Sequence, residues 1–170
     1  MRLTTRGRYA VMAMTDLAAC STETPTALVE IARRQDISLS YLEQLFGRLR
    51  RQGLVNSVRG PGGGYVLSRE ASEIRIAEII LAVDEPIETC RCAQEGLAPG
   101  EGCQHDGSRC LTHDLWDALA SHIFLFLDRL TLEDVVRKRV GCPSQASGEA
   151  SCVPVNAADA LHSVPPGGQP

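Results

Sequence analysis

The order of predicted elements between residues 26 and 68 constrains the fold of this chain more than any other feature. Residues 26–35 and 39–52 carry apolar side chains at helical spacing, and only three residues separate the two predicted helices. Thr26 and Ser38 are the predicted N-caps. Two short apolar runs then flank the sequence RGPGGG, which is typical of a β-hairpin tip. Two close-set helices followed directly by a hairpin indicate a winged helix-turn-helix.

Charge is divided unequally along the chain. The net charge is −4, but residues 1–69 hold ten arginines against five acidic residues. Residues 70–170 hold seven basic residues against sixteen acidic ones. This uneven distribution of charge could arise by chance on solvated surfaces. We favour a functional explanation, in which the first half binds nucleic acid and the acidic remainder has a different task.

The predicted helix over 39–52 has one apolar face and one polar face. The apolar stripe, predicted to face the core, consists of Leu39, Leu42, Leu45, Phe46 and Leu49. The side chains predicted to face outward are Ser40, Tyr41, Glu43, Gln44, Arg48 and Arg51. These are residue types that read a DNA major groove: glutamine pairs with adenine, glutamate accepts from cytosine, and arginine binds phosphate. Ser38 and Ser40, at the start of the helix, can present hydroxyl or backbone N–H groups to a phosphate.

The hairpin supplies a second candidate contact, Arg59, at the start of RGPGGG. An arginine on a slim loop suits a narrow minor groove, whose negative potential attracts it. A plain glycine-rich turn with one solvated arginine is the alternative, but the basic helix just upstream favours a DNA-binding wing. The sequence therefore predicts a mainly α fold: a winged helix-turn-helix with a small β-hairpin wing and a long C-terminal dimerisation helix.

The chain divides into four predicted segments. These are a winged-helix domain (1–85), a loop without periodicity (86–110), dimerisation helices (111–140) and a disordered tail rich in Gly, Pro, Ser and Ala (141–170). Further helices are predicted over 7–20, 76–83 and 111–130. A capping box formed by Thr131 and Asp134 predicts a fresh helix after the long one.

The helix over 111–130 carries two apolar stripes. One consists of Leu115, Leu119, His122 and Phe126, and the other of Trp116, Ile123, Leu127 and Leu130. His122 is interpreted as a packed core histidine. A chain this short cannot bury both stripes against itself, so one stripe is expected to meet the same helix of a second protomer. Such a homodimer would read double-stranded DNA with a palindromic operator.

Cysteines gather in the predicted loop. Cys90, Cys92, Cys103 and Cys110 fall within 21 residues, and His113 follows three residues after the last of them. Thiolates and imidazole bind both zinc and iron–sulfur clusters, and the spacing alone favours neither. Unligated thiols are the third possibility, and Cys90 and His105 are reserve ligands. No role is assigned to Cys142 or Cys152.

Four stretches give the chain a specific resemblance. MRLTTRGRYAV, ISLSYLEQLFGRLRRQGLVNSVRGPGGGY, AVDE and RC…RCLTH resemble the bacterial iron–sulfur cluster regulators of the IscR family over about residues 1–140. The resemblance implies a homodimeric winged-helix transcription regulator with a [2Fe–2S] cluster. The implied cluster ligands are Cys92, Cys103, Cys110 and His113. The implied DNA contacts are Ser38, Ser40, Glu43, Gln44 and Arg59.

The resemblance also implies what the regulator controls. The cluster-loaded form would repress genes for iron–sulfur assembly, cluster occupancy would change promoter choice, and the assembly machinery would be the cluster donor. Glu43 would belong to this switch, because an acidic side chain against DNA disfavours some sites. The insertion GLAPGE lengthens the loop relative to the family, so Cys90 competes with Cys92 as the first ligand. A nitric-oxide or redox sensor and a zinc-stabilised DNA-binding module are the alternatives.

Other classes of protein fit the sequence less well. We find no nucleophile–base pair and no substrate-pocket signal, so the chain is not expected to be an enzyme. The most apolar stretch, residues 118–127, is too short to span a membrane, and Asp16 interrupts any signal-peptide core. We expect a cytoplasmic protein with no membrane partner.

Overall fold

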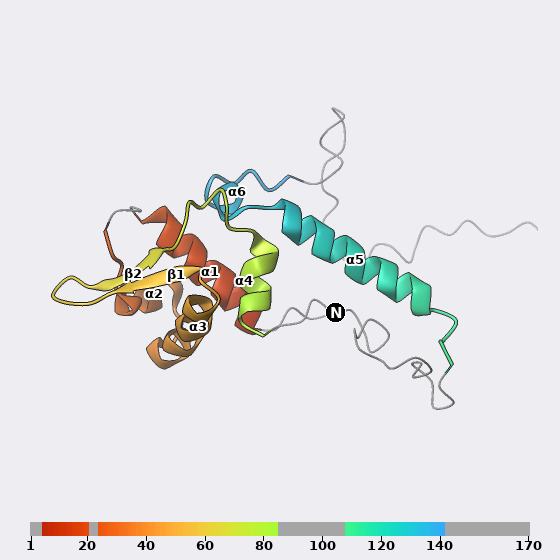
Figure 1. Cartoon of the computed structure of the whole chain (residues 1–170), viewed down its shortest axis with the longest axis horizontal. Helices are drawn as coiled ribbons and strands as arrows, with labels where there is room; N and C mark the ends of the chain where they lie inside the picture. Colours follow the sequence, from red (N-terminus) through yellow and green to blue (C-terminus); the bar gives the residue numbers. More distant parts are fainter. Residues whose placement is uncertain (1–4, 21–23, 85–107, 142–170) are drawn as a thin grey trace, which may run out of the picture. The chain divides into compact units, whose positions relative to one another are not determined.

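The structure, a computed structural model, describes residues 5–20, 24–84 and 108–141 (Figure 1). These residues form α1 (Thr5–Ala19), α2 (Leu28–Gln35), α3 (Leu39–Arg51), β1 (Val55–Val58), β2 (Gly64–Leu67), α4 (Ile76–Ala82), α5 (His113–Arg129) and α6 (Leu132–Val136). The predicted mainly α fold with a small hairpin is confirmed. Most of the predicted loop and tail lies outside the described residues.

Helix α1 is the centre of the packing, in contact with α2, α3, α4, α6 and β2. Its inner face is made of small or slender residues, with Ala10, Ala13 and Met14 fully buried. Small residues at these positions let the neighbouring helices approach closely. The largest fully buried side chain, Phe46 of α3, lies in this core and meets Tyr65 of β2 edge-on, with 4.9 Å between ring centroids.

The hairpin is extended at its base by a backbone bridge to Thr26. The Thr26 amide donates to the Tyr65 carbonyl at 3.0 Å, and the Tyr65 amide donates to the Thr26 carbonyl at 2.9 Å. The prediction that Thr26 caps α2 is therefore wrong, because its backbone completes the sheet and Ala27 takes the N-cap position. A Cβ at Gly64 would lie 2.3 Å from the Thr26 carbonyl oxygen, so this close approach requires glycine.

Helix α6, the last of the described helices, returns to the core of the winged-helix domain. The Leu132 amide donates to the Ile74 carbonyl at 2.8 Å, and the Leu132 side chain is fully buried. The predicted capping box is confirmed: Thr131 Oγ1 accepts from the Asp134 amide, and the Asp134 carboxylate accepts from the Thr131 amide, both at 3.1 Å. The helix ends at Val136, and Lys138 shortly after it adopts left-handed backbone geometry, with φ of 54°.

Helix α5 has the two predicted faces, except that Trp116 of the inner stripe has 38% of its surface exposed. Ile123 and Leu127 are half-buried, and Leu127 packs against the core. The other stripe is exposed: Leu115, Leu119, His122 and Phe126. The prediction that His122 is a packed core histidine is wrong, because nothing in the described part of the chain covers that face. None of the described helices is both long enough and apolar enough to cross a membrane.

Candidate nucleic-acid interface

Helix α3 presents most of the predicted DNA contacts to solvent. Leu42, Leu45 and Leu49 are buried beneath it and fix its orientation on the core. The exposed side chains on and before the helix are Ser38, Ser40, Glu43, Gln44 and Arg51. Ser38 takes the predicted N-cap position, but its hydroxyl makes no capping bond to the described helix. That side of α3 therefore combines hydroxyls, an amide, a carboxylate and a guanidinium on one rigid element.

Two residues at the start of α3 lie differently from the prediction. Tyr41, expected to face outward, is half-buried and meets Tyr9 of α1 edge-on, with 6.0 Å between ring centroids. Leu39, expected in the core, has 38% of its surface exposed. In the first turn of α3, Tyr41 therefore makes the contact with α1, and Leu39 does not lie in the core as the stripe predicted.

Arg48 also lies differently from the prediction. Its Nη1 donates to the Val83 carbonyl at 3.0 Å and to Asp84 Oδ2 at 2.7 Å, so the guanidinium joins α3 to the end of α4. Arg6 of α1 reaches the same turn, donating to the carbonyls of Val83 at 3.4 Å and Asp84 at 3.3 Å. The sequence reasoning missed this clamp. The one sequence feature that could have indicated the Arg48–Asp84 contact is an acidic residue, Asp84, directly after an apolar helix.

The hairpin tip carries Arg59, whose side chain is exposed. Gly60 and Gly62 have φ of 116° and 78°, geometry that non-glycine residues rarely adopt. Behind the tip, Arg50 of α3 donates to the Ser57 hydroxyl of β1 at 3.3 Å. Helix α3 is the second helix of the helix-turn-helix, which is called the recognition helix in this fold. A side-chain contact as well as the chain itself connects it to the hairpin wing.

An ion pair between the buried Asp16 and the partly exposed Arg34 joins α1 to α2. Asp16, expected on the polar side of α1, is buried and accepts from Arg34 Nη2 and Gln35 Nε2, each at 2.6 Å. Burial raises the pKa of Asp16, but the hydrogen bonds from Arg34 and Gln35 outweigh it, so the pKa lies below its usual range. The same pairing raises the pKa of Arg34. Helix α2, which precedes the recognition helix, is therefore held on α1 by charge.

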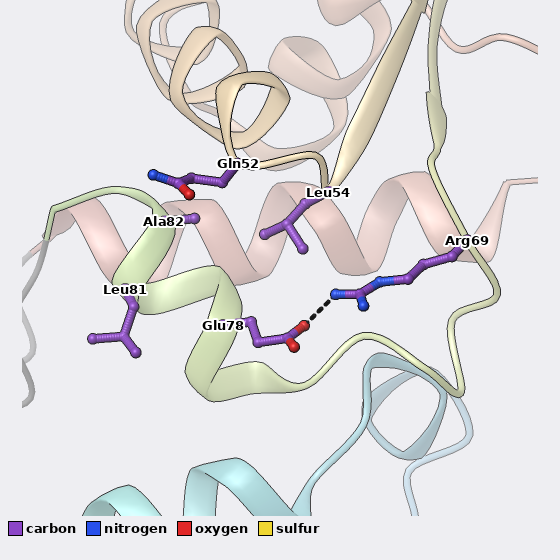
Figure 2. Close-up of a pocket in the computed structure, with 6 residues that line it drawn as sticks. All are labelled: Gln52, Leu54, Arg69, Glu78, Leu81 and Ala82. Atoms are coloured by element: carbon purple, nitrogen blue, oxygen red, sulfur yellow. Dashed lines mark hydrogen bonds and ion pairs between the residues drawn. The ribbon is translucent and has the colours of Figure 1, made fainter.

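A shallow pocket lies between the base of the hairpin, the end of α3 and α4 (Figure 2). An ion pair between Arg69 and Glu78 crosses it, and the Leu54 side chain points toward its centre. Of the residues predicted to contact DNA, none lines this pocket.

The cysteine-rich site is described only in part. Cys110 and His113 lie in the turn that opens α5, where the His113 amide donates to the Cys110 carbonyl at 3.0 Å, and both residues are half-buried. Cys90, Cys92 and Cys103 lie outside the described residues. Among the residues that are described, no three His, Cys, Asp or Glu side chains gather as a metal site.

Comparison with known proteins shows the family. A model of the Rrf2 family, described as "Iron-dependent Transcriptional regulator", matches residues 3–138. The chain belongs to the Rrf2 family. This Rrf2 protein is 56% identical to the HTH-type transcriptional regulator IscR of Photorhabdus laumondii over 139 residues, which are 82% of this chain and 81% of the relative. It is 55% identical to the protein of the same name from Xenorhabdus nematophila, with the same coverage of each chain.

Solved structures agree with this Rrf2 assignment. The chain is similar to CymR, the global cysteine regulator of B. subtilis, with a TM-score of 0.68, 34% identity, and coverage of 81% of this chain and 98% of that one. It is also similar to T. potens IscR, with a TM-score of 0.64, 33% identity, and coverage of 89% and 94%. These relatives are transcription regulators and not enzymes. This Rrf2 protein is a DNA-binding transcriptional regulator.

Proposed function

We propose that this protein senses cellular iron–sulfur status through a [2Fe–2S] cluster and represses genes for iron–sulfur assembly when the cluster is bound. The observation that carries the proposal is the turn at the start of α5, where Cys110 and His113 lie three residues apart. A thiolate and an imidazole together suit an iron–sulfur cluster with mixed ligands. The relatives named IscR and the iron-dependent family description support the same conclusion.

The four ligands would be Cys92, Cys103, Cys110 and His113. The cluster would supply a centre whose presence depends on iron supply and oxidants, delivered by the iron–sulfur assembly machinery. The chain's own contribution is to hold two donors in a turn that continues directly into α5. Binding at that turn can favour one arrangement of the protein over another, because a ligand shifts the population toward the state that it binds more tightly.

Dimerisation would use the exposed face of α5. Leu115, Leu119 and Phe126 lie on one side of the helix with 61%, 38% and 39% of their surface exposed. An apolar stripe of this length on a regulator is best covered by the same stripe of a second copy. The homodimer would place two copies of α3 on a palindromic operator in the cytoplasm.

The recognition surface would divide its work by element. Gln44 and Glu43 on α3 would read base edges, while Ser38, Ser40 and Arg51 would hold phosphates. Arg59 on the wing would enter the minor groove. The acidic side chain of Glu43 would weaken binding to some promoters. Whether such a promoter is bound would depend on whether the cluster site is occupied.

The test is the visible spectrum and DNA binding of protein purified without air. We expect a coloured protein containing iron and sulfide in equal amounts, with different promoter preference before and after chelation. Bound zinc without iron, or DNA binding that ignores iron content, would contradict the proposal.

A further inference from the structure

Thr112 occupies the N-cap position of α5 but does not cap the helix. A threonine at an N-cap normally accepts a hydrogen bond from a backbone amide of the first turn. Here the Thr112 side chain makes no capping bond. Its hydroxyl meets two side chains instead: the Trp116 indole and the Cys110 thiol.

The chemistry of the indole fixes the direction of one bond. Trp116 Nε1 lies 3.2 Å from Thr112 Oγ1, and an indole N–H can only donate, so the hydroxyl accepts from it. Cys110 Sγ lies 3.6 Å from the same hydroxyl, and either atom can donate while Cys110 is a neutral thiol. A cluster-bound thiolate has no proton and can only accept, so the Thr112 hydroxyl is then the donor. The three groups form a relay of hydrogen bonds from Trp116 through Thr112 to Cys110.

A thiolate ligand is a better acceptor for that proton than a neutral thiol is. We propose that Thr112, anchored by Trp116, donates a hydrogen bond to the Cys110 thiolate of the cluster site and thereby raises the cluster's reduction potential. The inference rests on the proposed function, and Thr112 is a positioning residue, not a ligand. A reduced cluster carries one more negative charge, so a donor at the ligand sulfur stabilises the reduced form more than the oxidised form.

The hydrogen bond from Trp116 fixes the orientation of the Thr112 hydroxyl toward Cys110. Without the indole, the Thr112 hydroxyl can turn to the backbone amides of the first turn of α5, which is the ordinary use of a threonine at this position. The backbone also favours the pairing, since the Trp116 amide donates to the Thr112 carbonyl at 3.2 Å and holds the two residues one turn apart.

The experiment measures the midpoint potential of the cluster in the full-length protein, by titration followed in the visible spectrum. Thr112→Val removes the hydroxyl and keeps the shape, Thr112→Ser keeps the hydroxyl, and Trp116→Phe removes the anchor. Ser121→Ala, an exposed hydroxyl further along α5, is the control. We expect a lower potential for Thr112→Val, a smaller decrease for Trp116→Phe, and wild-type values for Thr112→Ser and the control.

A second readout is the coupling of an exchangeable proton to the reduced cluster, measured by electron–nuclear double resonance in H₂O and D₂O. The His113 ring N–H gives such a coupling in every variant; one further coupling is expected in wild type and Thr112→Ser and should be missing in Thr112→Val. An unchanged potential and coupling in an iron-loaded Thr112→Val variant, or a Thr112→Ser variant as low in potential as Thr112→Val, overturns the inference alone. Wild-type protein without iron overturns the proposed function and the inference together.

Discussion

Arg48 of the recognition helix is ion-paired with Asp84, with 2.7 Å between Nη1 and Oδ2, although 71% of the Asp84 side chain is exposed. An exposed pair of this kind contributes little by itself, but the same guanidinium also donates to the Val83 carbonyl. Asp84 lies six residues before Cys90, the first cysteine of the cysteine-rich segment. The Arg48 contact therefore ties α3 to the chain shortly before that segment.

Arg48→Ala is expected to reduce both stability and DNA affinity. Loss of its hydrogen bonds should lower the free energy of unfolding by about 1 kcal/mol. Arg51→Ala is the matched control, because Arg51 is an exposed arginine on the same helix. It should leave urea unfolding unchanged and reduce the salt dependence of DNA binding by about one phosphate contact. Equal stability of the two variants would show that the Arg48 clamp contributes nothing to folding.

Asp16→Asn is expected to destabilise the domain by about 2 kcal/mol at pH 7, because hydrogen bonds to a charged partner are lost. The pKa of Asp16 is lowered by folding, so its contribution is complete above the ordinary value of 3.8 and declines as pH falls through the folded value. The difference between wild type and variant, measured by urea unfolding, should therefore shrink only below about pH 4.

Glu30→Gln is the control for this pair. Glu30 also approaches Arg34, at 3.7 Å, but its side chain is 58% exposed. Such a pair contributes at most a few tenths of a kcal/mol. A Glu30 variant as unstable as the Asp16 variant would mean that the charge of Arg34, and not the buried contact, matters.

Arg59→Ala and Gln44→Ala are expected to weaken DNA binding in different ways. The wing arginine should contribute to every operator, because minor-groove potential varies less between sequences than base edges do. Gln44→Ala should lose about 1–3 kcal/mol of discrimination at one base position in each half-site. Binding to a set of operators with single substitutions separates the two patterns. Uniform losses for both variants would refute the division.

Alanine at any of the four proposed ligands, Cys92, Cys103, Cys110 or His113, should abolish stable iron binding. Cys90→Ala is the matched control and should keep its iron, as measured by metal analysis and the visible spectrum. If Cys90→Ala loses iron and Cys92→Ala retains it, the first ligand is Cys90, and the insertion in the loop has shifted the site.

Phe126→Glu should convert the dimer to a monomer, because it places a charge in the exposed stripe of α5. Light scattering at micromolar concentration measures the change, and binding of a full palindrome should be lost with it. Val29→Glu is the control, since Val29 is an exposed apolar residue on α2, with 60% of its surface accessible. A wild-type monomer that still binds a full operator tightly would defeat the dimer proposal.

Short-range patterns in the sequence predicted the elements well. The apolar stripe of α3, the glycine-rich hairpin and the Thr131–Asp134 capping box each depend on residues within a few positions of one another. The two stripes of α5 were also correct as a pattern, although the exposure of His122 was not.

Partners distant in the sequence account for the rest. Thr26 pairs with Tyr65, and Asp16 pairs with Arg34, neither of which a local pattern can foresee. Arg48 is of a residue type that often contacts phosphate, but in the structure it donates a hydrogen bond to the carboxylate of Asp84, 36 positions later. The site at Cys110 was predicted from residue types, whereas the role of Thr112 emerged only from the side-chain contacts.

The return of Leu132 to the core means that residues 5–84 do not supply the whole core by themselves. A fragment ending at residue 84 would lose a fully buried leucine and the backbone partner of Ile74, a loss comparable to a large core truncation of about 2–5 kcal/mol. Helix α5 thus lies in the chain between two parts of one folding unit. A chimera that takes residues 1–84 from one relative and the remainder from another should therefore be unstable unless α6 comes from the same relative as residues 1–84.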